Sequence, residues 1–151
     1  MLYLATDHRG FQLKEAIKRF LTERGIAFED CGASSYMEGD DYVDFASAAA
    51  EKIVANPLEH KGIFLCGSGH GVDMVANKYR GIRAALCWDE DEAKKSRNDD
   101  DANVLVLVAD ETDEPEAYRI VTLWLATPFS GAERHVRRLG KIQEIERANF
   151  K

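Results

Sequence analysis

The sequence lacks any apolar run long enough to cross a membrane and any cleavable export signal at its start. No hydrophobic stretch approaches the ~18 residues that suggest a membrane-spanning helix. The chain opens directly into an apolar segment, without the basic region and cleavage site of a secretory signal peptide. Both absences predict a cytoplasmic protein that does not act at a membrane.

Cysteine is scarce, and basic residues are outnumbered. The three cysteines are odd in number and include no CxxC pair, which argues against a disulfide framework and favours a reducing compartment. Twenty Lys and Arg residues against 27 Asp and Glu residues leave a net charge of -7. We therefore expect no nucleic-acid partner, and any anionic substrate needs a local basic pocket.

Nucleotide and metal fingerprints are also missing. The stretch CGSGHG (66–71) is rich in glycine, but Val72 stands where the dinucleotide pattern GxGxxG needs its third glycine. No Gly-Lys-Ser/Thr follows, so the P-loop pattern fails, and Cys66 and His70 replace the glycines of a GxSxG nucleophile elbow. The histidines show no HxxxH spacing, and the acidic run 99–101 lacks the central glycine of a calcium loop. We expect no metal site.

Short apolar segments alternate with helical patterns along the whole chain. The expected strands are 2–6, 27–31, 62–66, 81–87 and 103–108, and the expected helices are 11–25, 43–56, 71–78, 89–97, 114–126 and 132–147. Near-continuous apolar strands separated by helices predict a parallel sheet that is covered on both faces. The sequence therefore predicts one doubly wound α/β domain over residues 1–151.

Ligands of such folds bind beyond the carboxyl ends of the strands. That rule selects the loops TDHRG (6–10), CGSGHG (66–71) and CWDEDE (87–92). The first two are polar and contain glycine, and we expect them to converge on one crevice.

Cys66 lies where an apolar strand meets the following helix. A helix N-terminus lowers the pKa of a thiol, which would make Cys66 a nucleophile or base near neutral pH. The alternative is a buried structural cysteine in a tight turn. Three glycines and Ser68 beside it favour the functional interpretation, because free backbone amides can stabilise an oxyanion such as an enediolate.

Two other motifs combine charged residues. Asp7 and His8 follow the first expected strand, where a carboxylate and an imidazole can orient hydroxyl groups or shuttle protons. The alternative for Asp7 is that it only caps the next helix. Arg134 and Arg138 are four residues apart on the last expected helix, so they can bind a phosphate together, although a solvated helix face is the usual explanation of such a pair.

Several collinear motifs resemble one family, the type B ribose-5-phosphate isomerases and galactose-6-phosphate isomerase subunits. The motifs are DHRGFQLKE (7–15), DCG (30–32), DYVDFA (41–46), GIFLCGSGHGVDMVANKYRGIRAAL (62–86), DDDANVLVL (99–107) and RHVRRLGKI (134–142). The resemblance implies a Rossmann-like three-layer α/β/α sandwich with a five-stranded parallel sheet and a C-terminal helix. It also implies an aldose–ketose isomerase for a small sugar phosphate of the ribose 5-phosphate type, without metal or cofactor. The enzyme would be a homodimer or a dimer of dimers with active sites between subunits.

The resemblance also assigns the chemistry of the glycine-rich loop. Cys66 matches the base that moves a proton between the carbonyl carbon and its neighbour. Ser68 stands at the usual threonine, and the amides of Gly67, Gly69 and Gly71 would hold the enediolate oxygens with it.

Further residues match the family's substrate-binding positions. Asp7 and His8 match its Asp-His pair at the sugar end, and Asn77 matches the asparagine of the ANK signature. Arg134 and Arg138 match arginines that bind phosphate.

Two departures from the family pattern make the expected pocket more acidic. Relatives usually read HNDAN where this chain has residues 99–103, so Asp99 replaces the histidine credited with opening the sugar ring. Relatives also commonly carry an arginine after the fifth strand, where this chain has Asp110. The added negative charge opposes a phosphate dianion.

Three explanations for these departures stay open. Asp99 takes the hydroxyl proton and opens the ring; or His70, at a position that is seldom histidine in the family, supplies the imidazole. Otherwise the substrate is a different or non-phosphorylated sugar, with Asp99 and Asp100 binding its hydroxyls. A non-catalytic sugar-binding relative is the alternative to an enzyme, but it would not need Cys66 and an intact glycine loop. We expect an isomerase.

Overall fold

Five parallel strands form one sheet in the structure, a computed structural model that describes residues 1–150. The strands are β1 (Leu2–Thr6), β2 (Phe28–Asp30), β3 (Lys61–Cys66), β4 (Ala84–Leu86) and β5 (Val104–Val108). The helices are α1 (Phe11–Glu23), α2 (Tyr42–Val54), α3 (His70–Ala76), α4 (Glu90–Asp100), α5 (Glu114–Ala126) and α6 (Glu133–Asn149), and a short 3-10 turn, η1 (His8–Gly10), links β1 to α1. The predicted α/β/α sandwich with a C-terminal helix is confirmed. No helix in residues 1–150 has the length and apolar character to cross a membrane.

The strand order is β2-β1-β3-β5-β4, with every neighbouring pair parallel. The chain moves from β1 to β2 on one side, and β3 then pairs with the other side of β1. The order therefore reverses between β1 and β3, which is the crevice where ligands of open α/β sheets bind. Thr6 pairs with Leu65 at the ends of these strands, so the loops that follow them begin side by side.

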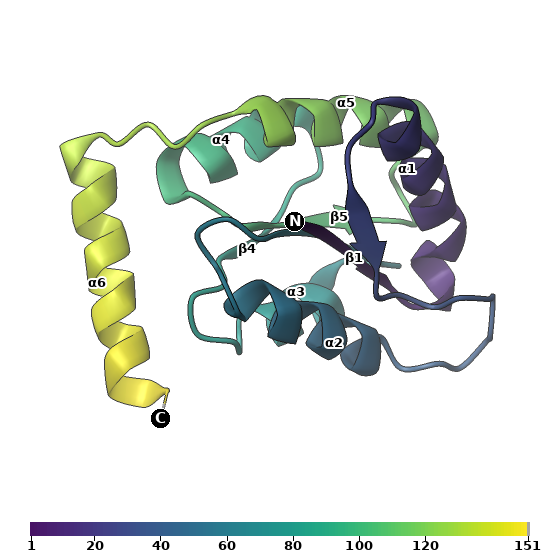
Figure 1. Ribbon diagram of the computed structural model, residues 1–151, viewed down its shortest axis with the longest axis horizontal. Coiled ribbons are helices and arrows are strands. Elements are labelled where there is room, and N and C mark those ends of the chain that lie inside the picture. Colours follow the sequence, from purple (N-terminus) through teal and green to yellow (C-terminus); the bar gives the residue numbers. More distant parts are fainter. Residues whose placement is uncertain (151) are drawn as a thin grey trace.

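Alternate residues of each strand supply the two cores of the sandwich. In β3, Ile63 and Leu65 pack with α1, α4 and α5, whereas Phe64 and Cys66 pack with α2 and α3. Figure 1 shows α1, α4 and α5 on one face of the sheet and α2 and α3 on the other. Because both faces are covered, the strands are apolar throughout, as the sequence pattern predicted.

Helix α6 stands apart from these layers. It lies across the edge of the sheet at which the strands begin, which we call the amino edge (Figure 1). Of its 17 residues only His135 is buried, while Val136 and Ile145 are exposed. Contacts near its start hold it to the body, among them the bond from the Ser130 amide to the Asn98 carbonyl at 3.0 Å. Further along the helix, the Gly81 amide donates to Glu146 Oε1 at 3.0 Å, while Val136 and Ile145 stay exposed.

Candidate active site

Cys66 ends β3 at the opposite, carboxyl edge of the sheet. Its side chain points into the α2–α3 core and is 5% exposed. The Cys66 carbonyl accepts a hydrogen bond from the Ala109 amide at 3.0 Å, which ties the strand end to the loop after β5. The thiol is thus held in one place and shielded from bulk water, as a proton-transferring group requires.

The glycines of the loop 66–71 leave room for neighbours that approach closely. Gly69 has φ = +76°, and a Cβ there would lie 2.4 Å from Leu86 Cδ1. A Cβ on Gly71 would lie 2.6 Å from the ring of Tyr42. Glycine alone adopts the left-handed backbone at position 69 without strain, and glycine alone leaves room for the Tyr42 ring at position 71. The loop is therefore packed into one shape rather than free to move.

Ser68 and His70 are the exposed side chains of this loop. The Ser68 hydroxyl accepts the His70 amide at 3.4 Å, so both residues face the same turn. One helical turn on, burial raises the pKa of Asp73 above its ordinary value, and His70 opposes this rise. Ser68, predicted to bind the oxyanion, and His70, predicted as an additional imidazole, are thus accessible from solvent, whereas Gly67, Gly69 and Gly71 are buried.

Asp7 is buried and caps η1. Its Oδ1 accepts the amides of Arg9 at 3.1 Å and Gly10 at 3.3 Å. This cap is the alternative role considered for Asp7, and the structure contains it. One potential ligand atom each from Asp7, His8 and Asp40 lies within 4.8 Å of the others, so the carboxylate also borders the histidine predicted to bind substrate.

His8 is held by Asp40, a residue that the sequence analysis missed. The backbone amide and the Nδ1 of His8 both meet Asp40 Oδ1, at 2.9 and 2.6 Å. The other Asp40 oxygen is buried and has no hydrogen-bond partner within residues 1–150. The ring of Tyr36 stands edge-on to the imidazole, with centroids 5.9 Å apart. The acidic pair at 40 and 41, before the expected helix, was the only sequence signal.

Arg9 is a second residue that the sequence analysis did not single out. Its guanidinium forms an ion pair with Asp110, across the top of Gly67. Three loops, which follow β1, β3 and β5, therefore meet at the carboxyl edge.

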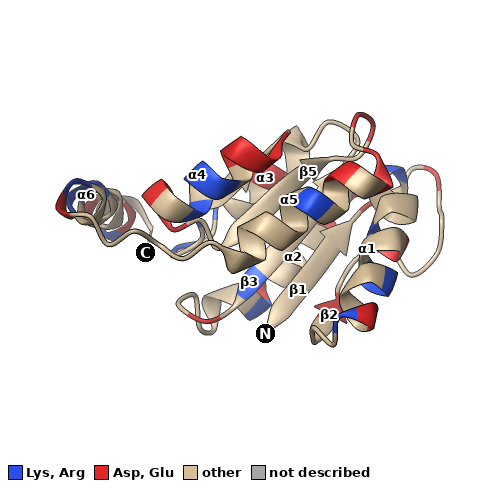
Figure 2. Ribbon diagram, turned by 90° about the horizontal axis from the view of Figure 1, so that it is seen from above, with Lys and Arg blue, Asp and Glu red and all other residues tan. Residues whose placement is uncertain are grey.

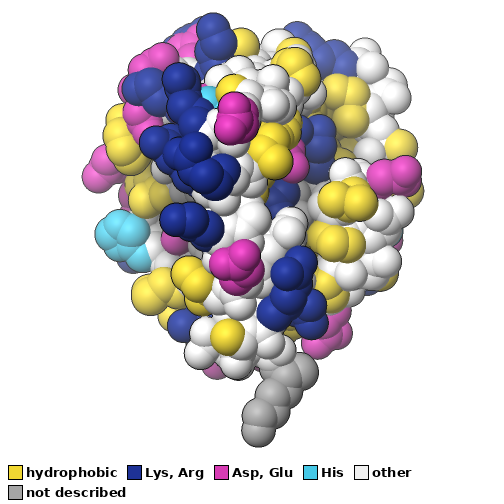
Figure 3. Space-filling model, turned by 90° about the vertical axis from the view of Figure 1, so that its left-hand side faces the viewer, with side chains coloured by type: hydrophobic (Ala, Val, Ile, Leu, Met, Phe, Trp, Pro, Cys, Tyr) yellow, Lys and Arg dark blue, Asp and Glu magenta, His cyan; other side chains and the backbone are white. Residues whose placement is uncertain are grey.

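Asp99 and Arg134 lie near each other, at the amino edge. Helix α4 begins after β4 and returns along the sheet to end just before β5. Figure 2 shows acidic residues at both ends of α4, the second set toward α6. Arg134 Nε donates to Nε2 of the buried His135 at 3.0 Å, and Asp99 Oδ1 lies 3.8 Å from the same nitrogen. Arg138 is exposed one turn further along α6, and Figure 3 shows that Lys and Arg side chains gather on this side of the molecule.

The predicted residues thus form two groups at opposite edges of one sheet. The first group, at the carboxyl edge, contains Asp7, His8, Cys66, Ser68, His70 and the three glycines. The second group, at the amino edge, contains Asp99, Asp100, Arg134 and Arg138. A single chain does not bring the two groups together.

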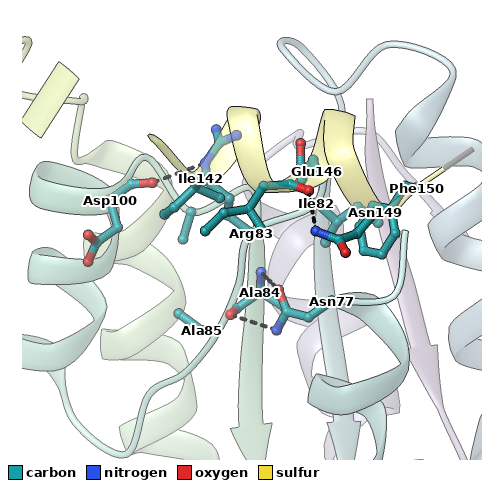
Figure 4. Close-up of a pocket in the computed structure, with 12 residues that line it drawn as sticks. Asn77, Ile82, Arg83, Ala84, Ala85, Asp100, Ile142, Glu146, Asn149 and Phe150 are labelled. Carbon is teal, nitrogen blue, oxygen red and sulfur yellow. Dashed lines mark hydrogen bonds between the residues drawn. The ribbon is translucent and has the colours of Figure 1, made fainter. Parts of the chain in front are cut away.

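Asn77 and Asp100 line a cavity of about 420 Å³ beneath α6 (Figure 4). The Asn77 amide bonds both backbone groups of Ala84, accepting from its N–H at 3.0 Å and donating to its carbonyl at 3.1 Å. The side chain therefore ties the end of α3 to β4. The α6 residues that line the cavity are the apolar Ile142 and Ile145 and the polar Glu146 and Asn149.

Comparisons with known proteins agree on one family. The family model described as Ribose/Galactose Isomerase matches residues 2–142. The chain is 40% identical over 148 residues to a ribose-5-phosphate isomerase B of Mycolicibacterium paratuberculosis, covering 98% of this chain and 92% of that protein. It is also 37% identical over 147 residues to a putative sugar phosphate isomerase of Bacillus subtilis, with 97% of each chain covered.

Solved structures give the same result. The fold matches ribose-5-phosphate isomerase B of Mycoplasma genitalium, crystallised with bound ribulose-5-phosphate, with a TM-score of 0.93 at 38% identity. That match covers 97% of this chain and 95% of the other. The isomerase of Thermotoga maritima matches with a TM-score of 0.89 at 44% identity, over 95% of this chain and 97% of the other.

Proposed function

This chain belongs to the ribose/galactose isomerase family, and we propose that it interconverts ribose 5-phosphate and ribulose 5-phosphate. One observation carries the proposal: a shielded thiol ends the strand at the switch point, beside a rigid glycine loop. It does so in a chain whose fold matches that of an isomerase holding ribulose-5-phosphate. The geometry supplies a base and amide donors for an oxyanion, which aldose–ketose isomerisation needs.

In the proposed mechanism Cys66 acts as the base. Its thiolate takes the proton from C2 of the open-chain aldose, and the electron pair moves to the carbonyl oxygen to give an enediolate. The Ser68 hydroxyl and the loop amides hold the enediolate oxygens. The thiol returns the proton to C1, while a proton moves from the C2 oxygen to the C1 oxygen, and the ketose forms. Burial of Cys66 limits exchange of this proton with water.

His8 binds the substrate through its free ring nitrogen. The bond between Nδ1 and Asp40 fixes the imidazole, so that Nε2 points away from the carboxylate. Asp7 keeps one oxygen on the η1 amides and borders the same space. Both side chains suit the hydroxyl groups of a sugar, which can donate to the Asp7 carboxylate and to the unprotonated Nε2 of His8.

A second copy of the chain completes the site. Asp99, Arg134 and Arg138 lie at the amino edge, so they reach the Cys66 loop only from another molecule. Helix α6 carries both arginines and exposes Val136, Ile142 and Ile145, as an arm that packs on a partner does. We therefore propose a homodimer or a dimer of dimers with shared active sites.

The three cysteines are free thiols, which the reducing cytoplasm would maintain.

Two side chains are candidates for opening the sugar ring. His70 lies on the same loop as Ser68, whereas Asp99 would come from the second copy. Cyclic ribose 5-phosphate needs this step, and an open-chain aldose does not. We would measure His70→Asn and Asp99→Asn side by side on both forms of the substrate. The variant that no longer converts the cyclic form but still converts the open-chain form identifies the residue that opens the ring.

A sugar panel tests the proposed function. Pentoses, hexoses and their phosphates are incubated with the protein, and aldose–ketose interconversion is followed. We expect ribose 5-phosphate to be converted with the highest kcat/KM. A higher kcat/KM for another sugar, or for a non-phosphorylated one, would show that the proposed substrate is wrong. Binding of a sugar without conversion would identify a non-catalytic relative.

A further inference from the structure

Arg9 and Asp110 meet above the backbone of Gly67. A Cβ at Gly67 would lie 2.5 Å from Arg9 Nε, 2.8 Å from Arg9 Cζ and 2.9 Å from Asp110 Oδ2. The guanidinium and the carboxylate thus both contact the residue that follows Cys66. Resting on the proposed function, we propose that Arg9 is the specificity-determining cation of this active site, which binds the substrate's phosphate, and that Asp110 positions it.

The backbone on either side of the pair is fixed. Asp7 holds the Arg9 amide at 3.1 Å, and the Asp110 amide donates to the Gly67 carbonyl at 3.1 Å. The two residues lie 101 positions apart in sequence, yet β1 and β5 both neighbour β3 and deliver them to the same point. The guanidinium therefore has a set direction before any ligand arrives, which lowers the entropy cost of binding.

The stability of the fold does not explain this pair. Arg9 is 57% and Asp110 41% exposed, and ion pairs that face water contribute about 0–1 kcal/mol. A guanidinium carries five N–H donors, and Asp110 accepts from only one of its nitrogens, Nη2. Donors are left over for a second anion, and planar guanidinium groups bind phosphate oxygens in pairs.

The charge of the surroundings favours such a cation. Asp7, Asp40 and Asp110 lie at this edge in a chain of net charge -7. A phosphate dianion would be repelled by these carboxylates unless a cation stood between them. Arg9 neutralises Asp110 and is one residue from His8, so the phosphate would be bound beside the substrate-binding imidazole.

The pair also accounts for the acidic departure at position 110. The family resemblance places an arginine after the fifth strand, where this chain has aspartate. Here the guanidinium comes from the loop after β1, and the carboxylate after β5 holds it in place. The positive charge is retained above Gly67 while its position in the sequence has changed.

The test measures affinity and turnover separately. Arg9→Ala is compared with wild type for KM and kcat with ribose 5-phosphate, and for the Kd of inorganic phosphate by calorimetry. We expect KM and the phosphate Kd to rise about 10- to 100-fold, as loss of a charge-assisted hydrogen-bond donor predicts, with a smaller change in kcat. Asp110→Asn should also raise KM, but less than Arg9→Ala does.

Two controls sharpen the result. Arg19→Ala removes an exposed arginine that pairs loosely with Glu114, at 3.8 Å, and should change neither constant. The double variant Arg9→Ala/Asp110→Arg returns a guanidinium from the other side of Gly67 and should recover affinity that Arg9→Ala loses.

The outcomes separate this proposal from the proposed function. Phosphate affinity that is unchanged in a folded Arg9→Ala protein would overturn the role of Arg9, whether or not the enzyme turns over. Wild-type protein that binds phosphate but converts no ribose 5-phosphate would overturn the proposed function alone. If the double variant binds phosphate no more tightly than Arg9→Ala, the idea that the guanidinium at position 9 replaces one at position 110 would be overturned.

Discussion

His8 and Asp40 are joined twice, because one carboxylate oxygen accepts both the backbone amide and the ring Nδ1 of the histidine. The two residues are 32 positions apart, and the loop before α2 brings the carboxylate to the end of β1. The carboxylate fixes the orientation of the ring and the nitrogen that carries its proton. We therefore propose that Asp40 acts on the substrate by positioning His8.

Loss of this carboxylate should reduce catalysis more than stability. In Asp40→Ala the imidazole can rotate and change tautomer, so we expect kcat/KM for ribose 5-phosphate to fall about tenfold, in line with the loss of one charge-assisted hydrogen bond. Asp41→Ala is the matched control, because the Asp41 side chain makes no capping bond at the start of α2. Equal activity of the two variants, measured by steady-state kinetics, would contradict the positioning role.

Lys14 is fully buried and depends on Asp30 for compensation of its charge. Its Nζ lies 2.5 Å from Asp30 Oδ2 and 2.8 Å from the Ala33 carbonyl. Asp30→Ala removes the shorter of the two carboxylate contacts of this buried ammonium and leaves Glu15 Oε1 at 3.3 Å, so the free energy of unfolding should fall by about 3 kcal/mol. Chemical denaturation measures the change. Glu29→Ala removes the neighbouring exposed carboxylate and should cost far less; equal losses would contradict the account.

The same pair predicts how stability changes with acid. Burial alone would raise the pKa of Asp30, but hydrogen bonds from Lys14, Lys18 and the Gly32 amide outweigh it and hold the pKa below its ordinary value. A carboxylate whose pKa is lower in the folded state contributes stability above its unfolded pKa. That contribution is lost as pH falls through the folded value. Stability of wild type should therefore drop below about pH 4, with a smaller drop in Asp30→Ala.

Mixing two inactive variants tests whether active sites are shared. Cys66→Ala disables the group at the carboxyl edge, and Arg134→Ala/Arg138→Ala disables the group at the amino edge. In a hybrid dimer one site carries both defects and the other carries neither. Random exchange should therefore restore about a quarter of wild-type activity.

The matched control places all three substitutions in one chain. Mixed with Cys66→Ala, that chain should restore nothing, because every site then lacks Cys66. Native mass spectrometry confirms that hybrids have formed. Hybrids without activity in the first mixture would contradict sharing of the site.

The sequence predicted the fold where local pattern decides it. The bounds expected for β1 and α5 match the structure, since each is an apolar segment with clear limits. The strands expected at 27–31 and 81–87 shortened to three residues, because β2 and β4 are edge strands that pair on one side only. Pattern alone does not reveal which strands lie at an edge.

The candidate site was predictable only in part. Cys66 and its loop stood out because their composition is unusual over a few residues. Asp40 and Arg9 did not, since their roles depend on contacts with residues 32 and 101 positions away. The separation of Asp99, Arg134 and Arg138 from Cys66 likewise follows from the direction of α4 and the course of α6, which are properties of the fold.

The central claim is that Cys66 moves the proton, and the Cys66→Ala variant tests it most directly. Isomerisation of ribose 5-phosphate is measured together with its binding by calorimetry. We predict that turnover falls by at least about 100-fold, the usual effect of losing an acid–base group, while the Kd for the sugar phosphate changes little. Turnover at the wild-type rate in the folded variant would contradict the account.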